Sequence, residues 1–312
     1  MGLRKDIWRP AIVAAPAADI VARGSLDGLP VHWLPPMPPF RFLADPFGLW
    51  RDGRLNVFVE TYDYRDRTGA IEVLVHDAAL ALVERQIVLR EPWHLSYPVV
   101  FEADGATWLL PEAHRSGRLT LYRAVEFPWR WTPAAVIALD AVAVDATPLW
   151  HDGRWWLFYA PGGAGDDRQG ALHVAFADRL DGRWWPHPGN PVRTGRADSR
   201  PGGTAMIVDG AVVLPVQDCS RTYGGAIRAL RFDRLDPGRI EARAGPAIVA
   251  PPGFAPFVEG LHTLSAAGAV TLVDAKRTIF SARGIAIELR REAAKLLRTR
   301  GAPDGVTRVP RA

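Results

Sequence analysis

The sequence predicts an all-β fold, a five-bladed β-propeller that ends in a short basic C-terminal helix or tail. Three observations predict it: 29 Gly and 27 Pro among 312 residues, an Asp-Gly turn that recurs between apolar runs, and the regular spacing of these units. Gly and Pro spread along the chain indicate many tight turns joining short strands. Units of about 50 residues that each form a small antiparallel sheet are typical of propellers.

The repeated unit is a hairpin. Four units carry Asp-Gly, at 52–53, 104–105, 152–153 and 209–210, and a fifth has Ala267-Gly268. Asp-Gly between β-rich runs favours a hairpin because both turn positions must accept a positive φ. Further strand-like runs between the hairpins raise each blade to at least three strands, and they span 70–77, 118–124, 171–178 and 226–233.

Two segments flank the predicted propeller at 41–287. Residues 1–40 are interpreted as a lead-in packed on it, and residues 288–312 as a basic helix or tail. In that tail Leu289, Ala293, Leu296 and Leu297 recur at helical spacing among basic residues. A basic amphipathic helix suits weak contact with a membrane surface or a partner, and a solvated helix is the alternative.

Composition excludes several classes of protein. The net charge of +4 is concentrated in the tail, which argues against a nucleic-acid surface on the body. The lone Cys219 excludes an internal disulfide and a multi-cysteine zinc site, and no histidine pair has helical metal-ligand spacing, so neither metal nor cofactor is expected.

Prolines and an Asp interrupt the apolar N-terminal stretch, which argues against a signal peptide or membrane span. We expect a cytoplasmic protein, at most peripheral to the inner face of the membrane.

Polar residues stand at equivalent ends of the repeated hairpins. In a propeller every inner strand runs in the same direction along the channel, so these positions meet at one mouth. The strand starts are Asp45, Tyr97, Asp145, Arg200 and His262. The hairpin ends are Glu60, Glu112, Tyr159, Gln217 with Asp218, and Asp274 with Lys276.

Such a rim suits glycoside chemistry. Crowded carboxylates raise some pKa values, which keeps one acid protonated while another is ionised, as proton donation beside a base or nucleophile requires. We predict Asp45 as base or nucleophile, Glu112 as proton donor, and Asp145 as the residue that orients the sugar or tunes the pKa values. The predicted substrate-binding residues are Glu60, Tyr97, Arg200, Gln217, Asp218, His262 and Lys276.

Structural roles are the alternatives for several of these residues. The Asp before Pro46 could cap a turn, Glu112 could be a solvated loop acid, and His262 could be a satisfied structural histidine. Arg200 could instead hold blade four to its neighbour by an ion pair.

A set of motifs resembles one domain family over residues 8 to 276. They are "FLADPFGLW", "HLSYPVVFEADGATWLLPEA", "LTLYRA", "VDATPLWHDGRWWLF", "ADSRPGGTA", "QDCSRTYGGAI" and "GLHTLS". The family is the N-terminal domain of plant glucosamine inositolphosphorylceramide transferases and their bacterial relatives. The resemblance implies a sugar-related role, although in the plant enzymes the transferase chemistry is attributed to a separate C-terminal domain that this chain lacks.

More distantly the chain resembles the five-bladed glycosidases of the arabinanase/xylosidase and invertase/levansucrase type. In those enzymes one Asp opens blade one and another opens blade three, which Asp45 and Asp145 match. They carry a general-acid Glu at the start of blade four, where this chain has Arg200, and that departure makes Glu112 the substitute acid.

The leading interpretation is an enzyme that hydrolyses or transfers a glycosyl group on a glycan or glycolipid. The expected cytoplasmic location favours a role in the assembly of a glycan or glycolipid. The alternative is a non-catalytic glycan- or glycolipid-binding propeller that supports a glycosyltransferase partner. A propeller used only for protein interaction would have an apolar or flat rim, which the sequence does not show.

Overall fold

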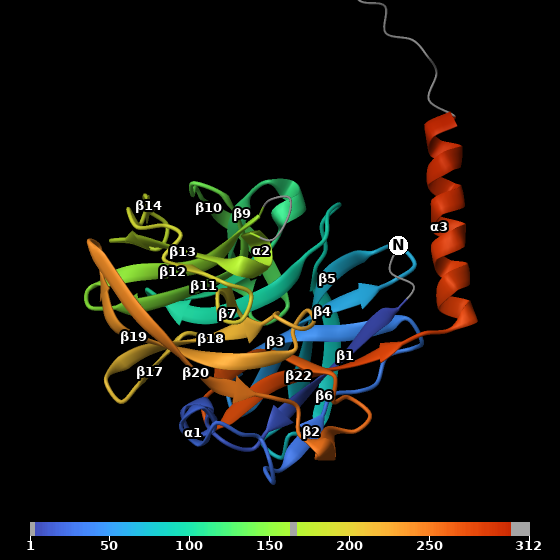
Figure 1. Ribbon diagram of the computed structural model, residues 1–312, viewed down its shortest axis with the longest axis horizontal. Helices are drawn as coiled ribbons and strands as arrows, with labels where there is room; N and C mark the ends of the chain where they lie inside the picture. The colour runs from blue at the N-terminus through green and yellow to red at the C-terminus, as the bar shows by residue number, and fades with distance from the viewer. Residues whose placement is uncertain (1–3, 163–166, 301–312) are drawn as a thin grey trace, which may run out of the picture.

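The computed structural model describes residues 4–162 and 167–300, whose strands form five sheets of four or five strands each (Figure 1). The inner strands contact one another around the ring: β3 (Arg41–Arg51) with β7 (Ser96–Ala103), β7 with β11 (Val142–His151), β11 with β16 (Arg200–Pro201), and β21 (Gly260–Ala267) with β3. Gly203, which follows β16, closes the cycle through a parallel bridge to Leu264 of β21. This arrangement confirms the predicted five-bladed β-propeller.

Blades one and two are four-stranded antiparallel sheets in which sequence neighbours pair. Blade one has the order β3 (Arg41–Arg51), β4 (Arg54–Asp63), β5 (Thr68–His76), β6 (Leu82–Leu89). Blade two has β7 (Ser96–Ala103), β8 (Ala106–Glu112), β9 (Leu119–Glu126) and β10 (Arg130–Ile137).

Blades three and four are five-stranded because an inner or outer position is divided between two short strands. Blade three contains β11 (Val142–His151), β12 (Arg154–Gly162), β13 (Ala171–Ala177), β14 (Trp185–Pro186) and β15 (Arg193–Thr194). Blade four contains β16 (Arg200–Pro201), β17 (Met206–Val208), β18 (Ala211–Asp218), β19 (Ala226–Asp236) and β20 (Arg239–Ile248).

Blade five joins the two ends of the described chain. Its order is β21 (Gly260–Ala267), β22 (Val270–Ile279), β1 (Lys5–Val13) and β2 (Val31–Trp33). Strand β1 pairs antiparallel with β22 along its whole length. The segment 1–40, expected as a lead-in packed on the propeller, therefore supplies outer strands of a blade; pairing with β1 satisfies backbone groups that β22 would otherwise expose at a sheet edge.

The helices are few and peripheral. They are α1 (Ala17–Arg23), α2 (Asp167–Gly170), α3 (Ala282–Arg300) and the 3-10 turns η1 (His114–Ser116) and η2 (Pro252–Phe254). The C-terminal helix begins at Ala282 rather than at residue 288, and side chains are described to residue 293. Within the described part of the chain, none of these helices has both the length and the apolar composition that crossing a bilayer requires.

The predicted Asp-Gly hairpins have the expected backbone. At each of the four turns the Asp has a φ between 48° and 52° and the Gly a φ between 69° and 75°. These values match a hairpin turn that needs positive φ at both positions.

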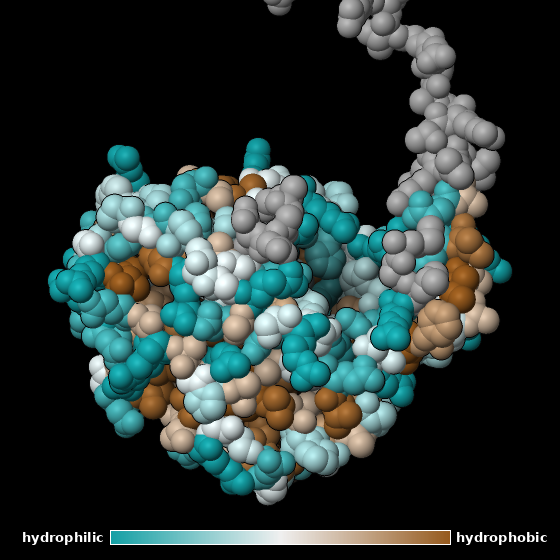
Figure 2. Space-filling view, in the orientation of Figure 1, coloured by the Kyte–Doolittle hydropathy of each residue, from teal (hydrophilic) through white to brown (hydrophobic). Residues whose placement is uncertain are grey.

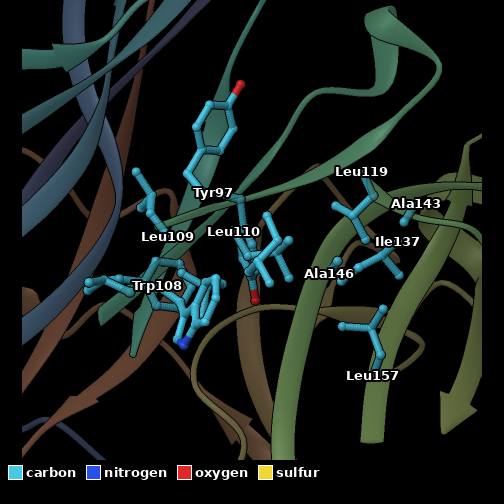
Figure 3. Close-up of a cluster of buried hydrophobic side chains, with 14 of the residues drawn as sticks. Tyr97, Trp108, Leu109, Leu110, Leu119, Ile137, Ala143, Ala146 and Leu157 are labelled. Carbon is cyan, nitrogen blue, oxygen red and sulfur yellow. The ribbon is translucent and has the colours of Figure 1, made fainter. Parts of the chain in front are cut away.

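Apolar side chains fill the space between blades. Figure 3 shows one such cluster, which includes Tyr97, Leu109 and Leu110 of blade two and Ala146 and Leu157 of blade three, with Leu110 on the side that faces blade three. All five are at most 2% exposed, so the blades are held together by close packing around the polar mouth.

Candidate functional site

Three inner strands share the same distortion. Asp45, Tyr97 and Asp145 have φ values of 50°, 46° and 51°, and the strand pairing shifts register at each of them. A positive φ is uncommon outside glycine, and a bulge of this kind re-aims the residue that it contains. Equivalent places in the repeat therefore hold the same special backbone.

Each bulge donates its backbone N–H to a carboxylate of the preceding blade. The N–H of Asp45 donates to Oδ2 of Asp274 at 2.8 Å, and that of Tyr97 donates to Oδ2 of Asp45 at 3.2 Å. The N–H of Asp145 donates to Oε2 of Glu112 at 3.3 Å. The carboxylates thus link successive blades around the channel mouth.

His262 lies between two of these carboxylates. Its Nδ1 is 2.7 Å from Oδ1 of Asp274 and its Nε2 is 3.3 Å from Oδ1 of Asp45, while the ring stacks on Trp8 with centroids 3.7 Å apart. Burial alone would lower the pKa of His262, but the charges of Asp274 and Asp45 raise it. Burial raises the pKa of Asp45 to about 6, although His262 opposes the rise.

The same three side chains are a possible metal-ligand group. Asp45, His262 and Asp274 present ligand atoms within 4.8 Å of one another. A cation bound to the Nδ1 nitrogen of His262 would replace the hydrogen bond between that nitrogen and Asp274, because a ligating nitrogen uses its lone pair. His262 already pairs with both Asp45 and Asp274. The expectation that the site holds no metal stays a prediction.

Glu60 is buried beside a neutral histidine. His94 Nδ1 accepts the backbone N–H of Gly69 at 2.8 Å, so its proton is on Nε2, which lies 3.5 Å from Oε1 of Glu60. Burial lowers the pKa of His94 to about 4, so this ring is uncharged at neutral pH. Burial, followed by the charges of Asp45 and Glu112, raises the pKa of Glu60 well above its ordinary value. This environment favours the protonated form of Glu60; burial likewise raises the pKa of Asp145, although the charge of Arg200 opposes that rise.

Glu112 has the opposite electrostatic environment. His114 Nδ1 lies 2.6 Å from its Oε1, and Arg200 adds a positive charge. Burial by itself would raise the pKa of Glu112, but these two groups bring it down to about 2. A proton-donor role for Glu112 stays a prediction that this direction of shift opposes.

Asp145 forms a buried ion pair across blades three and four. Arg200 Nε donates to Oδ2 of Asp145 at 2.7 Å, and Gln217 donates to the same oxygen at 2.9 Å. Burial by itself would lower the pKa of Arg200, but the negative charge of Asp145 raises it, so the guanidinium is charged. This geometry matches the alternative in which Arg200 joins two blades.

Tyr97 connects three blades at the centre of the propeller. Its hydroxyl oxygen accepts the N–H of Gly203 at 2.7 Å and lies 3.0 Å from the hydroxyl of Thr147. The side chain is 1% exposed, so substrate could reach it only after a rearrangement.

Two further predicted residues lie outside this network. Asp218 pairs with Arg228 of the neighbouring strand at 2.9 Å. Lys276 lies over the Trp8 ring and donates to the hydroxyl of Thr222 at 3.0 Å. Their substrate-binding roles stay predictions.

Solvent reaches some members of the site and not others. The side chains of Asp45, Glu60 and Arg200 are 10%, 8% and 10% exposed, whereas that of Asp274 is fully buried. The first three side chains can contact a ligand in the channel. Asp274 cannot, and it contributes by binding Asp45 and His262.

The sequence placed Asp274 at the channel mouth, because it ends the hairpin of the fifth repeat as Glu60 ends that of the first, but indicated no role for it. His94 and His114 were not predicted at the site. His94 lies just before β7 and His114 in η1, both outside the repeated hairpin, so no pattern marked them.

Comparison with known sequences gives a consistent match. The family described as "Glucosamine inositolphosphorylceramide transferase 1, N-terminal" matches residues 35–242. A protein named glucosamine inositolphosphorylceramide transferase 1 from Arabidopsis thaliana is 36% identical over 238 residues, which are 74% of this chain and 30% of that protein. The protein of the same name from Oryza sativa subsp. japonica is 34% identical over 203 residues, 63% of this chain and 27% of the relative. The chain thus spans less than a third of the length of these curated relatives.

Solved structures show the same fold at low identity. Zg3597, a family 117 glycoside hydrolase from Zobellia galactanivorans, has a TM-score of 0.52 and 13% identity over 68% of this chain and 71% of its own. A glycosyl hydrolase from Bacteroides ovatus has a TM-score of 0.54 and 13% identity over 78% of this chain and 90% of its own. At such identities the likeness is one of fold.

Proposed function

The chain belongs to the family defined by the N-terminal region of glucosamine inositolphosphorylceramide transferase 1, and from this premise we propose that it is a carbohydrate-active enzyme that hydrolyses or transfers a glycosyl group at its channel mouth. The resemblance predicted from the motifs is confirmed by that membership. The name of the relatives, which joins a sugar to a phosphorylceramide lipid, favours the headgroup of a glycolipid as substrate.

One observation carries the proposal: Glu60 and Asp45 belong to the same buried site, and their surroundings favour different protonation states. Burial and neighbouring negative charges raise the pKa of Glu60 well above its ordinary value and so favour its protonated form, while Asp45, with a pKa of about 6, is mostly ionised at neutral pH. Glycosyl cleavage needs this division between a proton donor and a base or nucleophile.

In the proposed reaction Glu60 donates its proton to the glycosidic oxygen as the bond from that oxygen to the anomeric carbon breaks. Asp45 either attacks the anomeric carbon or removes a proton from the attacking water or acceptor hydroxyl. Water as the acceptor gives hydrolysis, and a hydroxyl of another molecule gives transfer. Arg200 and His262 bind an anionic or hydroxyl-rich part of the substrate.

This assignment gives Glu60 the proton-donor role that the sequence predicted for Glu112. His114 and Arg200 favour the ionised form of Glu112, so a proton on that carboxyl is costly. Glu112 then has a positioning role, because it holds the backbone N–H of Asp145. Asp145 in turn orients Arg200 through their ion pair.

The second candidate function is a non-catalytic glycan- or glycolipid-binding propeller that serves a glycosyltransferase partner. One observation favours it: three of the buried carboxylates already hold backbone N–H groups. Cytoplasmic residence stays a prediction under either function.

The test is a thermal-shift screen of glycans, glycolipid headgroups and nucleotide sugars, followed by product analysis of each hit. Glu60→Gln removes the proposed acid, and Glu84→Gln, on the exposed face of strand β6, is the matched control. Product formed by the parent and by Glu84→Gln but not by Glu60→Gln, with the ligand-induced shift kept in all three, supports the enzyme. A shift without product in the parent favours the binding protein, and no shift with any sugar contradicts both functions.

A further inference from the structure

Helix α3 is fixed to the propeller through one buried carboxylate. Glu288, whose side chain is 2% exposed, accepts hydrogen bonds from Arg67 at 2.9 and 3.0 Å and from Arg291 at 2.9 Å. Lys5 of strand β1 completes an ion pair with the same group. Blades one and five therefore set the direction of the helix, which projects beyond the sheets in Figure 1.

The same segment carries large apolar side chains that are open to solvent. Phe280 and Leu289, at 64% and 61%, are the two most exposed large apolar side chains in the described part of the chain. Ala286, Leu289 and Ala293 recur at three- and four-residue spacing and so share the face of α3 turned away from Glu288. Figure 2 shows hydrophobic side chains along that outer side of the helix. We call Phe280 and this face of α3 the docking surface.

The charge of the chain is gathered in the same segment. Residues 282–312 contain eight Lys and Arg and three Asp and Glu, a net charge of +5. Since the whole chain carries +4, the other residues together carry −1. Arg283 and Arg290, both exposed, lie beside the apolar face of the helix.

The docking surface is attached at the mouth side of the propeller. Arg67, which binds Glu288, lies in the turn from β4 to β5, at the same end of blade one as Glu60. Arg115 of η1 donates to the carbonyl of Arg67 at 3.4 Å, and the preceding His114 pairs with Glu112. The anchor of α3 and the carboxylate site therefore belong to one end of the molecule.

We infer that α3 and Phe280 dock this protein on an anionic lipid bilayer, with the channel mouth on the docked side. Phe280 and Leu289 enter the boundary between headgroups and acyl chains, and the flanking basic residues contact lipid phosphates. A second copy of the chain is a poor occupant because it would bring two segments of charge +5 together. The inference goes beyond the proposed function and needs no sugar substrate for its test.

Vesicle flotation of the full chain tests this surface. We expect the protein to float with vesicles of phosphatidylcholine that contain phosphatidylserine, to float about tenfold less with phosphatidylcholine alone, and to be released by high salt. Leu289→Asp should reduce binding to the anionic vesicles about tenfold, because it places a negative charge at the bilayer boundary and removes apolar area. Val136→Asp is the matched control, because Val136 on β10 is also an exposed large apolar residue but lies outside the docking surface. This variant should bind like the parent.

Both variants change exposed residues, and melting curves check that each is folded. Flotation of the parent and Leu289→Asp to the same extent overturns the inference, and so does the absence of flotation with anionic vesicles. A concentration-dependent dimer that Leu289→Asp dissociates would assign the surface to a second copy and overturn it as well. None of these outcomes bears on Asp45 or Glu60, so failure here is distinct from failure of the proposed function.

Discussion

The backbone N–H of Asp45 donates a hydrogen bond of 2.8 Å to the carboxylate of Asp274, which is 229 residues further along the chain. The first inner strand of the propeller is thereby tied to the last blade at the site itself. Asp45 in turn accepts the N–H of Tyr97 in blade two. Asp45, the proposed base or nucleophile, therefore also helps to close the ring of five blades.

Asp274→Asn should destabilise the fold strongly. Its two carboxylate oxygens accept from Asp45, His262 and Thr263 in a fully buried position, and an amide can accept on only one side. We expect a loss of roughly 3 kcal/mol in the free energy of unfolding, measured by chemical denaturation. Asp178→Asn, at an exposed position after β13, is the control, and equal stability of the two variants would contradict the supporting role of Asp274.

Asp45→Asn should abolish turnover without lowering the melting temperature. Because burial raises the pKa of Asp45 from 3.8 to about 6, the stability present with the protonated group is lost as pH rises through that interval. The ionised group therefore costs the folded state about 3 kcal/mol at neutral pH, a cost that a neutral Asn avoids. Asn also accepts the positive φ of this bulge. A variant that melts well below the parent would instead support a structural cap.

The rate of the proposed reaction should be bell-shaped in pH. Activity should rise through about pH 6 as Asp45 ionises, and should fall at higher pH as Glu60, whose pKa is raised, loses its proton. The check is a pH profile of product formation in the parent and in Glu112→Gln. If the falling limb disappears in Glu112→Gln, then Glu112 and not Glu60 is the proton donor.

Tyr97→Phe should weaken the fold and leave the pH profile unchanged. Removal of the hydroxyl leaves the N–H of Gly203 without its buried acceptor, which costs roughly 1–3 kcal/mol. Denaturation and the Michaelis constant for any identified substrate measure the two effects separately. An increase in the Michaelis constant with unchanged stability would restore the substrate-binding role predicted for Tyr97.

The sequence alone determined the repeated architecture, because the signals that specify it are local. Asp152 and Gly153 are adjacent in the chain and need only their own backbone angles to form a hairpin turn. Equivalent positions in successive hairpins then identified Asp45 and Asp145 as neighbours at one mouth. The closure of blade five was not visible in this way, since β1 and β22 lie at opposite ends of the chain and pair only in the folded protein.

Only the tertiary structure decided the direction in which the pKa of each carboxyl shifts. Glu60 and Glu112 end equivalent hairpins and look alike in sequence, yet their pKa values shift in opposite directions. Glu60 faces a neutral His94 and other negative charges, whereas Glu112 receives a hydrogen bond from His114 and the field of Arg200. The pKa of a buried acid depends on the charges and donors within a few ångströms of it, and here several of these come from distant parts of the chain.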